Sequence, residues 1–214
     1  DVRIEKVFRS LVRIETGRLE EVKEKDDTGA FIRLFDGQRW FYASTTDLAS
    51  IDFELAGLAK LGRADARINE HPAVRKMQVN TGDHCRFAQT SVSKVQLPEK
   101  ITLTESFADL VKNDGQISHW SVSYSDAHII KQFYSSLGAN LKFDTQAAGL
   151  RLGFRFGSGA NVFSETWCKA LPEFKPLAGL HHEARELVEK AREFFTSAEK
   201  IQGGNYTVVL SPMA

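Results

Sequence analysis

Histidines beside carboxylates are the residues of this sequence best suited to bind a metal, and His181-His182-Glu183 is the most suggestive group. A helical zinc site of the His-Glu-x-x-His type places two histidines four residues apart on one helix face. Here the position of the second histidine is taken by Glu186, so that spacing is missing. We interpret the group as a solvated first turn of a helix, in which Glu183 favours the helix dipole.

Three other groups carry metal ligands or thiols. Asp83-His84-Cys85 offers three ligand types, but adjacent residues rarely converge on one metal without a further partner, so an ordinary loop or strand end is the simpler interpretation. His119 and His128 are expected to flank a hairpin and could meet across two strands, but a polar position on a strand face is the preferred interpretation. Cys168 follows Trp167 in an alternating pattern, which is typical of a small buried thiol.

Glycines and arginines suggest anion sites only weakly. Gly153, Gly157 and Gly159 resemble a phosphate loop, but no helix opens after them. Arg151 and Arg155 share one face of a predicted strand, where they could hold an anion or a peptide carboxylate; a solvated face is the simpler interpretation. No nucleophile, base and orienting group emerges, so the residues alone assign no catalytic, cofactor-binding or metal site.

Composition bounds the class of protein. A chain of 214 residues fits one large domain or two small ones. The 28 basic residues balance the 28 acidic ones, which argues against nucleic acid or an anionic membrane as a partner. The longest apolar runs are too short for a membrane-spanning helix. Two cysteines, far apart, favour a reducing, cytoplasmic compartment.

Residues 1–65 are predicted to form an antiparallel β-meander followed by a helix. Apolar residues alternate over residues 2–14, which predicts a half-buried strand with a bulge or bend. Turns are predicted at Thr16-Gly17, Asp26-Asp27-Thr28-Gly29 and Asp36-Gly37, separating strands over residues 19–25, 30–35 and 40–43. A helix capped by Asp47 or Ser50 is expected to stop at Gly62.

Residues 66–116 are predicted to be a connector that adds extended segments to the sheet. Residues 73–79 and 87–97 could each be extended, with Pro98 ending the second segment. A short helix is then indicated by apolar residues at helical spacing, namely Leu103, Phe107, Leu110 and Val111.

Residues 117–214 are predicted to be a second β-meander with a long helix and a terminal strand. A turn is expected at Ser125-Asp126, and the clearest alternation places Leu150, Leu152, Phe154 and Phe156 on one strand face. After Pro176 a long helix has an apolar face formed by Leu180, Ala184, Leu187, Ala191, Phe194 and Ala198. The fold class is therefore α+β, with antiparallel β-meanders and packed helices in two meander-then-helix units.

Both ends of the sequence are abrupt. Residues 206–210 are rich in β-branched and aromatic types, which predicts a strand buried on both faces, yet the sequence stops four residues later. We therefore expect a front part of a longer protein. Unpaired strand edges predict self-association into a dimer or a larger species.

Four segments carry a resemblance to a known family: residues 16–22, 29–35, 40–48 and 204–212. Their order and spacing together are hard to obtain by chance, and the rest of the chain matches mainly in layout. The sequence resembles the amino-terminal half of the TldD/PmbA family, once described as modulators of DNA gyrase.

This resemblance implies a cytoplasmic zinc metallopeptidase that cleaves flexible or unfolded peptides as a homodimer or with a paired family subunit. In the family, zinc is held by a His-Glu-x-x-x-His motif shortly after the strand that resembles residues 206–210, and by a more distant cysteine. That motif is not in this sequence, so no residue, Cys168 included, is assigned as a ligand. Zinc is expected in the full-length family member and not in these 214 residues.

The predicted function is that of a non-catalytic portion that supplies substrate-groove walls and subunit contacts. The alternatives are a metal-free partner subunit and a stand-alone binding or assembly module of the same family. A role on DNA is disfavoured by the zero net charge.

Overall fold

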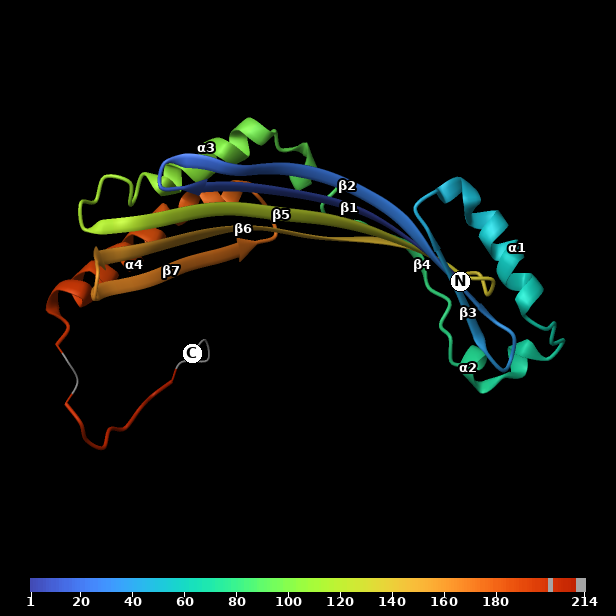
Figure 1. The fold of residues 1–214 in the computed structure, drawn as a ribbon. Helices are drawn as coiled ribbons and strands as arrows, with labels where there is room; N and C mark the ends of the chain where they lie inside the picture. The colour runs from blue at the N-terminus through green and yellow to red at the C-terminus, as the bar shows by residue number, and fades with distance from the viewer. Residues whose placement is uncertain (200–201, 211–214) are drawn as a thin grey trace.

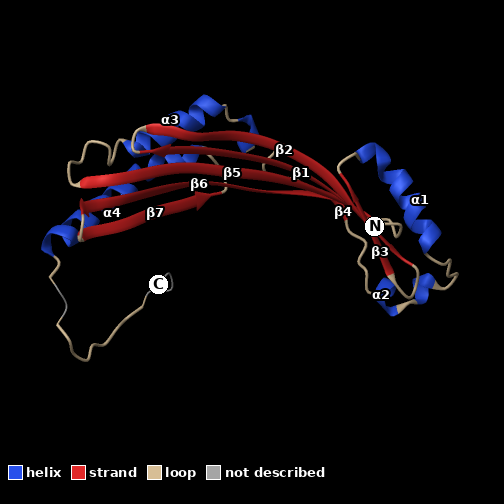
Figure 2. Ribbon diagram, in the orientation of Figure 1, coloured by secondary structure: helices blue, strands red, loops and turns tan. Residues whose placement is uncertain are grey.

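Long antiparallel strands dominate the computed structural model, which describes residues 1–199 and 202–210 (Figures 1 and 2). Within these residues seven strands form one sheet, in the order β3-β2-β1-β5-β6-β4, and β7 also pairs with β6. The strands are β1 (Val2–Glu15), β2 (Arg18–Phe35), β3 (Trp40–Thr45), β4 (Thr81–His84), β5 (Ile117–Tyr134), β6 (Asn140–Ser158) and β7 (Asn161–Leu171). The predicted α+β class with antiparallel sheet strands is confirmed.

Helices lie beside the two ends of the curved sheet (Figure 1). They are α1 (Ile51–Leu61), α2 (Pro72–Arg75), α3 (Leu97–Ala108) and α4 (His181–Ser197). Helices α1 and α2 lie near β3, whereas α3 and α4 lie along β1, β5, β6 and β7. None of the helices in the described part of the chain is long and apolar enough to cross a membrane.

The two predicted meanders share one sheet because β1 pairs antiparallel with β5 along its whole length. The strands are also longer than predicted, since the chain runs straight through the expected turns at Asp26-Asp27-Thr28-Gly29 and Ser125-Asp126. Both turn predictions were wrong for the same reason. Asp27 forms ion pairs with neighbouring strand residues, and Asp126 is a buried hydrogen-bond acceptor, so each acidic residue has a partner within the sheet.

The core lies on the face of the sheet that α3 and α4 cover. The predicted alternation in β6 is confirmed, because Leu150, Leu152, Phe154 and Phe156 are at most 3% exposed. Helix α4 contributes buried Ala184, Val188 and Ala191 to the same core. Burying a large apolar side chain of this kind contributes about 1.5–3 kcal/mol, so this layer holds the helices on the sheet.

Helix boundaries follow local capping chemistry. The side chain of Asp47 accepts a hydrogen bond from the Ala49 N–H before α1, and α1 stops at Gly62 as predicted. Pro98 was expected to end an extended segment but instead lies in the first turn of α3. Proline suits that position because the N–H it lacks would have no helical partner there.

The connector contains less strand than predicted. The expected extended segments over residues 73–79 and 87–97 were wrong, because α2 and a 3-10 helix (Val92–Lys94) occupy parts of them. Side chains of His71 and Ser91 accept hydrogen bonds from the first turns of these helices and so stabilise them locally. The strand of this region is β4, which pairs parallel with β6.

The terminal strand predicted over residues 206–210 is also wrong in this structure. These residues form no strand, and Tyr206 and Val209 are 57% and 91% exposed. A strand of such composition gains stability from neighbours, and within the described residues none lies beside it. The domain boundaries proposed at residues 65 and 116 stay predictions.

Candidate functional site

The group His181-His182-Glu183 lies at the start of α4 and is only partly exposed to solvent. His181 and Glu183 bind neighbouring elements and so hold the helix in place. His181 Nε2 lies 2.8 Å from Ser106 Oγ of α3, and its ring stacks on Phe107. His182 remains solvent-exposed, as predicted for this turn. The carboxylate of Glu183 accepts hydrogen bonds from Lys169 and Trp167 of β7, and that from Lys169 is the main cause of a lowered pKa for Glu183.

Asp83-His84-Cys85 forms the end of β4 and the residue after it, as the strand-end interpretation expected. Asp83 accepts hydrogen bonds from the Cys85 N–H and from Lys142 Nζ, and these lower its pKa to about 2. Across the residues that the structure describes, no three His, Cys, Asp or Glu side chains converge closely enough to hold a metal ion. The residues present therefore do not fit the zinc site that the family resemblance implies.

His119 and His128 do not meet across a hairpin, because both lie on β5. His119 contacts Glu15 and Thr16 near the sheet surface. His128 is only 6% exposed, although nothing in its sequence neighbourhood indicated burial. The expected hairpin between the two histidines was wrong, because residues 117–134 form one strand without a turn, and the alternative that they meet across strands falls with it.

His128 belongs to a buried group that we call the histidine cluster: Ser91, His128 and Asp144. Its ring joins Ser91 Oγ at 2.8 Å through Nδ1 and Asp144 Oδ2 at 3.0 Å through Nε2. A serine, a histidine and an aspartate in this order resemble a hydrolytic relay. Here, however, the Ser91 hydroxyl also accepts from the Ser93 N–H and contacts the Ser93 hydroxyl, so its hydrogen-bonding capacity is used. The cluster holds the connector on the sheet.

Asp144 is the residue of this cluster that binds the connector backbone. Its two carboxylate oxygens accept from the Arg86 N–H at 2.7 Å and the Phe87 N–H at 3.1 Å. Burial alone would raise the pKa of Asp144, but these two N–H groups and His128 together lower it. No local sequence pattern indicated the cluster, because its members come from three separate segments.

A second buried group, the lysine cluster, consists of Ser10, Lys100, Tyr124 and Asp126. Lys100 of α3 is completely buried, with Nζ 3.0 Å from Asp126 Oδ2 and 3.0 Å from Ser10 Oγ. The Tyr124 hydroxyl donates to Asp126 at 2.6 Å. Burial, then this hydrogen bond, raises the pKa of Tyr124 well above its usual range. The group fixes α3 to β1 and β5.

Cys168 differs from its predicted role, whereas the nearby glycines and arginines do not. Cys168 is exposed because the alternation of β7 buries its neighbour Trp167 instead, so the buried-thiol interpretation was wrong. Gly157 and Gly159 have φ values of +73° and +61° in the tight turn between β6 and β7, which explains their glycines without a phosphate. Arg151 and Arg155 lie on the exposed face of β6, as predicted.

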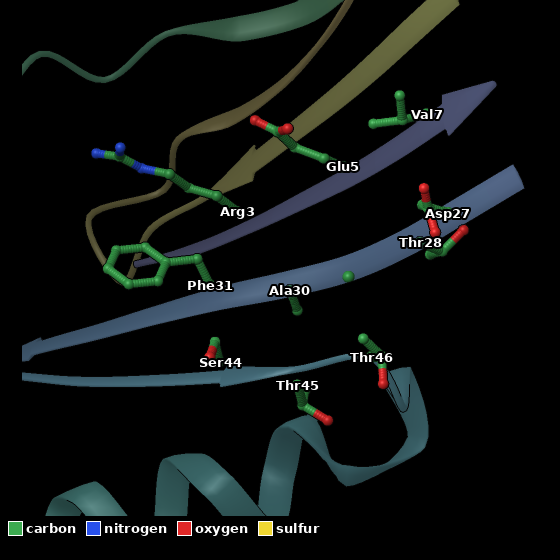
Figure 3. Close-up of a pocket in the computed structure, with 11 residues that line it drawn as sticks. Arg3, Glu5, Val7, Asp27, Thr28, Ala30, Phe31, Ser44, Thr45 and Thr46 are labelled. Carbon is green, nitrogen blue, oxygen red and sulfur yellow. The ribbon is translucent and has the colours of Figure 1, made fainter. Parts of the chain in front are cut away.

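A wide groove runs across β1, β2 and the end of β3 (Figure 3). It has a volume of about 830 Å³. The lining residues are Arg3, Glu5, Val7, Asp27, Thr28, Gly29, Ala30, Phe31, Ser44, Thr45 and Thr46. Acidic groups along it are matched by cations, since Glu5 pairs with Lys131 and Asp27 with Lys25. The groove therefore has no strong preference for the charge of a ligand.

The groove opens where β3 ends. Strand β3 pairs with β2 only from Ala30 to Phe35, so within the described chain the rest of β2, residues 18–29, has no strand on its outer side. Backbone N–H and C=O groups on such an edge can pair with an extended chain. Sequence reasoning missed the groove, because residues 26–29 were interpreted as a turn between two strands.

The first part of the chain matches a known protein family. Residues 1–67 match the family described as PmbA/TldA metallopeptidase domain 1. The resemblance to the amino-terminal half of this family is thereby confirmed, and the groove lies entirely inside the matched residues.

Solved structures of the PmbA/TldD type share the fold of most of the chain. A protein described as a modulator of a DNA gyrase from Thermotoga maritima has a TM-score of 0.66 at 18% identity, covering 95% of this chain and 46% of that protein. A similarly described protein from Bacteroides thetaiotaomicron has a TM-score of 0.61 at 18% identity, with coverages of 88% and 45%. TldE from Thermococcus kodakarensis has a TM-score of 0.60 at 14% identity, with coverages of 88% and 43%.

The chain thus spans less than half the length of these structures, and at such identities the likeness is one of fold. No curated protein sequence matches the chain.

Proposed function

We propose that this chain is the non-catalytic amino-terminal portion of a PmbA/TldD-type zinc metallopeptidase acting on flexible peptides. The observation that supports it is the match of residues 1–67 to a metallopeptidase first domain, which contains the groove beside the unpaired edge of β2. In this proposal the β2 edge forms one wall of the substrate groove. The zinc and its ligands belong to the part of the full-length protein that follows these residues.

The β2 edge suits a substrate of little sequence specificity. Strand addition uses main-chain hydrogen bonds, which every residue except proline can make, and takes specificity from side-chain pockets only where they exist. Hydrophobic lining here is limited to small or partly exposed residues such as Ala30 and Phe31. A flexible peptide can become extended against this edge, whereas a folded protein would first have to release a strand.

Subunit contacts are the second part of the proposal. In the described chain the outer edge of β2 over residues 18–29 and the outer edge of β7 both lack a neighbouring strand. Such edges pair with other chains unless they are protected. We expect a homodimer or a pair with a related family subunit, and analytical ultracentrifugation across micromolar concentrations is the measurement; sedimentation as a monomer throughout contradicts it.

A metal-free partner subunit or a stand-alone binding or assembly module is the alternative. The similar structures are described as gyrase modulators or as TldE, and these descriptions name no peptidase activity. Zinc content of the purified full-length protein separates the two. Stoichiometric zinc supports the peptidase portion, and its absence supports the partner subunit or module.

Strand addition at the groove is tested with backbone-modified peptides. A fluorescent unstructured peptide is titrated with the 214-residue chain, beside the same peptide N-methylated at alternate residues. N-methylation removes N–H donors and blocks pairing, so we expect at least tenfold weaker binding. A peptide of scrambled sequence is the control and should bind as well as the original. Equal affinity of the N-methylated peptide contradicts the proposed groove wall.

A further inference from the structure

The face of the sheet opposite α3 and α4 is lined by small polar residues. On β5, β6 and β7 this open face includes Ser121, Ser123, Ser125, Ala127, Gly149, Gly153, Ser164, Thr166, Cys168 and Ala170, with His119 opposite Arg155, as the register of the three strands shows. Two long cationic side chains, Arg151 and Arg155, stand among them, and both residues are exposed. The open face is thus low in relief apart from two guanidinium groups and the His119 ring.

A hollow of about 310 Å³ lies beside one of these cations. Arg151, Ser123 and Ser125 line it, with Gly149 and Cys168. In the described part of the chain, Arg151 has no carboxylate within ion-pair distance, and neither serine hydroxyl takes part in a hydrogen bond. The hollow therefore combines a positive charge with hydroxyl groups that are available to a ligand.

Other cations of the open face are already matched by carboxylates. Arg9 lies 3.7 Å from Asp27, and Arg13 lies 2.7 Å from Glu15. Arg155 has no such carboxylate among the described residues and donates to the Ser164 hydroxyl at 3.3 Å. On β6, by contrast, neither Arg151 nor Arg155 has a carboxylate partner among the described residues, in a chain whose net charge is zero.

Gly153 lies between the two arginines on the same strand face and leaves the backbone bare. A Cβ added there would meet Ser121 Oγ at 3.5 Å and Thr166 Oγ1 at 3.7 Å, which are ordinary contact distances. Packing inside the chain therefore does not require a glycine at this position. The missing side chain at Gly153 gives a partner room to approach the sheet between Arg151 and Arg155.

We propose that this open face binds an extended polypeptide segment that carries acidic side chains four residues apart. Residues i and i+4 of any extended chain lie on one face about 13 Å apart, so such a segment running along β6 matches the spacing of Arg151 and Arg155. Each guanidinium binds one carboxylate, in the geometry that arginine favours. The residue between the two acidic ones passes over Gly153. The inference does not depend on a peptidase function.

The probe is a fluorescent ten-residue peptide of glycine, serine and alanine with two glutamates four residues apart. Its anisotropy is measured with the 214-residue chain, beside a peptide with glutamine at both positions and one with two adjacent glutamates. The original peptide should bind at least tenfold more tightly than the glutamine peptide and more tightly than the adjacent one. The double variant Arg151→Ala and Arg155→Ala should lose at least tenfold in affinity, and Gly153→Val should also weaken binding.

Arg185→Ala is the matched control, because Arg185 is an exposed arginine of α4 and makes no ion pair among the described residues. It should bind the peptide as the unmodified chain does, and thermal unfolding should show that every variant folds. Equal binding of the glutamine peptide, or of the double variant, overturns the proposal. Equal binding of the adjacent-glutamate peptide overturns the spacing, and displacement by millimolar phosphate as effective as by unlabelled peptide overturns a polypeptide ligand.

Discussion

Two buried polar clusters include nearby residues of the same strand, and each holds a different part of the chain on the sheet. Asp126 of the lysine cluster and His128 of the histidine cluster both lie on the covered face of β5. The lysine cluster joins side chains of a helix and two strands around a buried ion pair. In the histidine cluster, by contrast, a carboxylate binds the backbone of a connector and a histidine binds the hydroxyl of Ser91.

The comparison shows which kind of interaction stabilises each cluster. A buried ion pair is costly to desolvate, and breaking it leaves one charge uncompensated, so its members depend strongly on one another. Hydrogen bonds from backbone N–H groups to a carboxylate hold a loop without requiring a second charge. The lysine cluster therefore sets where α3 lies, and the histidine cluster sets the course of the connector.

Removing the amine of the lysine cluster should have the largest effect. In Lys100→Ala the Asp126 carboxylate stays buried without its cation, and we expect a loss of about 3–5 kcal/mol in the free energy of unfolding. Urea denaturation followed by circular dichroism measures it. Lys112→Ala, which removes an exposed lysine paired with Asp109, is the control and should change stability little. A loss below about 1 kcal/mol for Lys100→Ala would contradict the ion-pair account.

The histidine cluster should respond less, and in a pH-dependent way. Asp144→Asn weakens the acceptor of two backbone N–H groups, for an expected loss of about 2–3 kcal/mol near neutral pH. The folded-state pKa of Asp144 lies below its ordinary value of 3.8, so its stabilisation is complete above that pH and is lost as the pH falls through the folded-state value. The difference between the two proteins in urea should accordingly shrink below pH 3.8. A difference independent of pH would show that the carboxylate charge is not involved.

Tyr124→Phe sharpens the comparison within the lysine cluster. The hydroxyl is one of several donors to Asp126, so its loss should cost about 1–1.5 kcal/mol, less than the loss of Lys100. The same urea measurement applies. If Tyr124→Phe destabilised as strongly as Lys100→Ala, the hydrogen bond and not the ion pair would dominate the cluster.

Asp83→Asn should have the smallest effect. Asp83 lies on the exposed strand β4 and binds Lys142 in solvent, where such pairs add little. We expect no resolvable change in the urea midpoint at neutral pH. A clear destabilisation would mean that β4 is more important to the sheet than its exposure indicates.

The parts of the fold that depend on local patterns were predictable from sequence. Alternation in β6 identified the covered face through Leu152 and Phe154, and Gly62 marked the end of α1. These signals are contained within a few consecutive residues. They require no knowledge of what the segment contacts.

Both polar clusters and the groove lay beyond such reasoning. Asp126 resembles a turn residue in the sequence, and only its partner Ser10, which lies 116 residues away, shows why a strand continues through it. The groove depends on relative strand length, since β2 has 18 residues and β3 only 6. The residues of β2 that have no neighbouring strand in the described chain show no sequence pattern that would reveal its absence.

The pairing of β1 with β5 also constrains the order of folding on the ribosome. Hairpin β1–β2 can form as soon as residues 2–35 emerge, whereas the other side of β1 must wait for residues 121–134. At typical synthesis rates this delay is on the order of ten seconds, during which β1 exposes an unpaired edge. Non-local pairing of this kind also slows refolding in isolation. A chaperone would therefore reduce aggregation most during the interval in which the first domain has emerged and residues 121–134 have not.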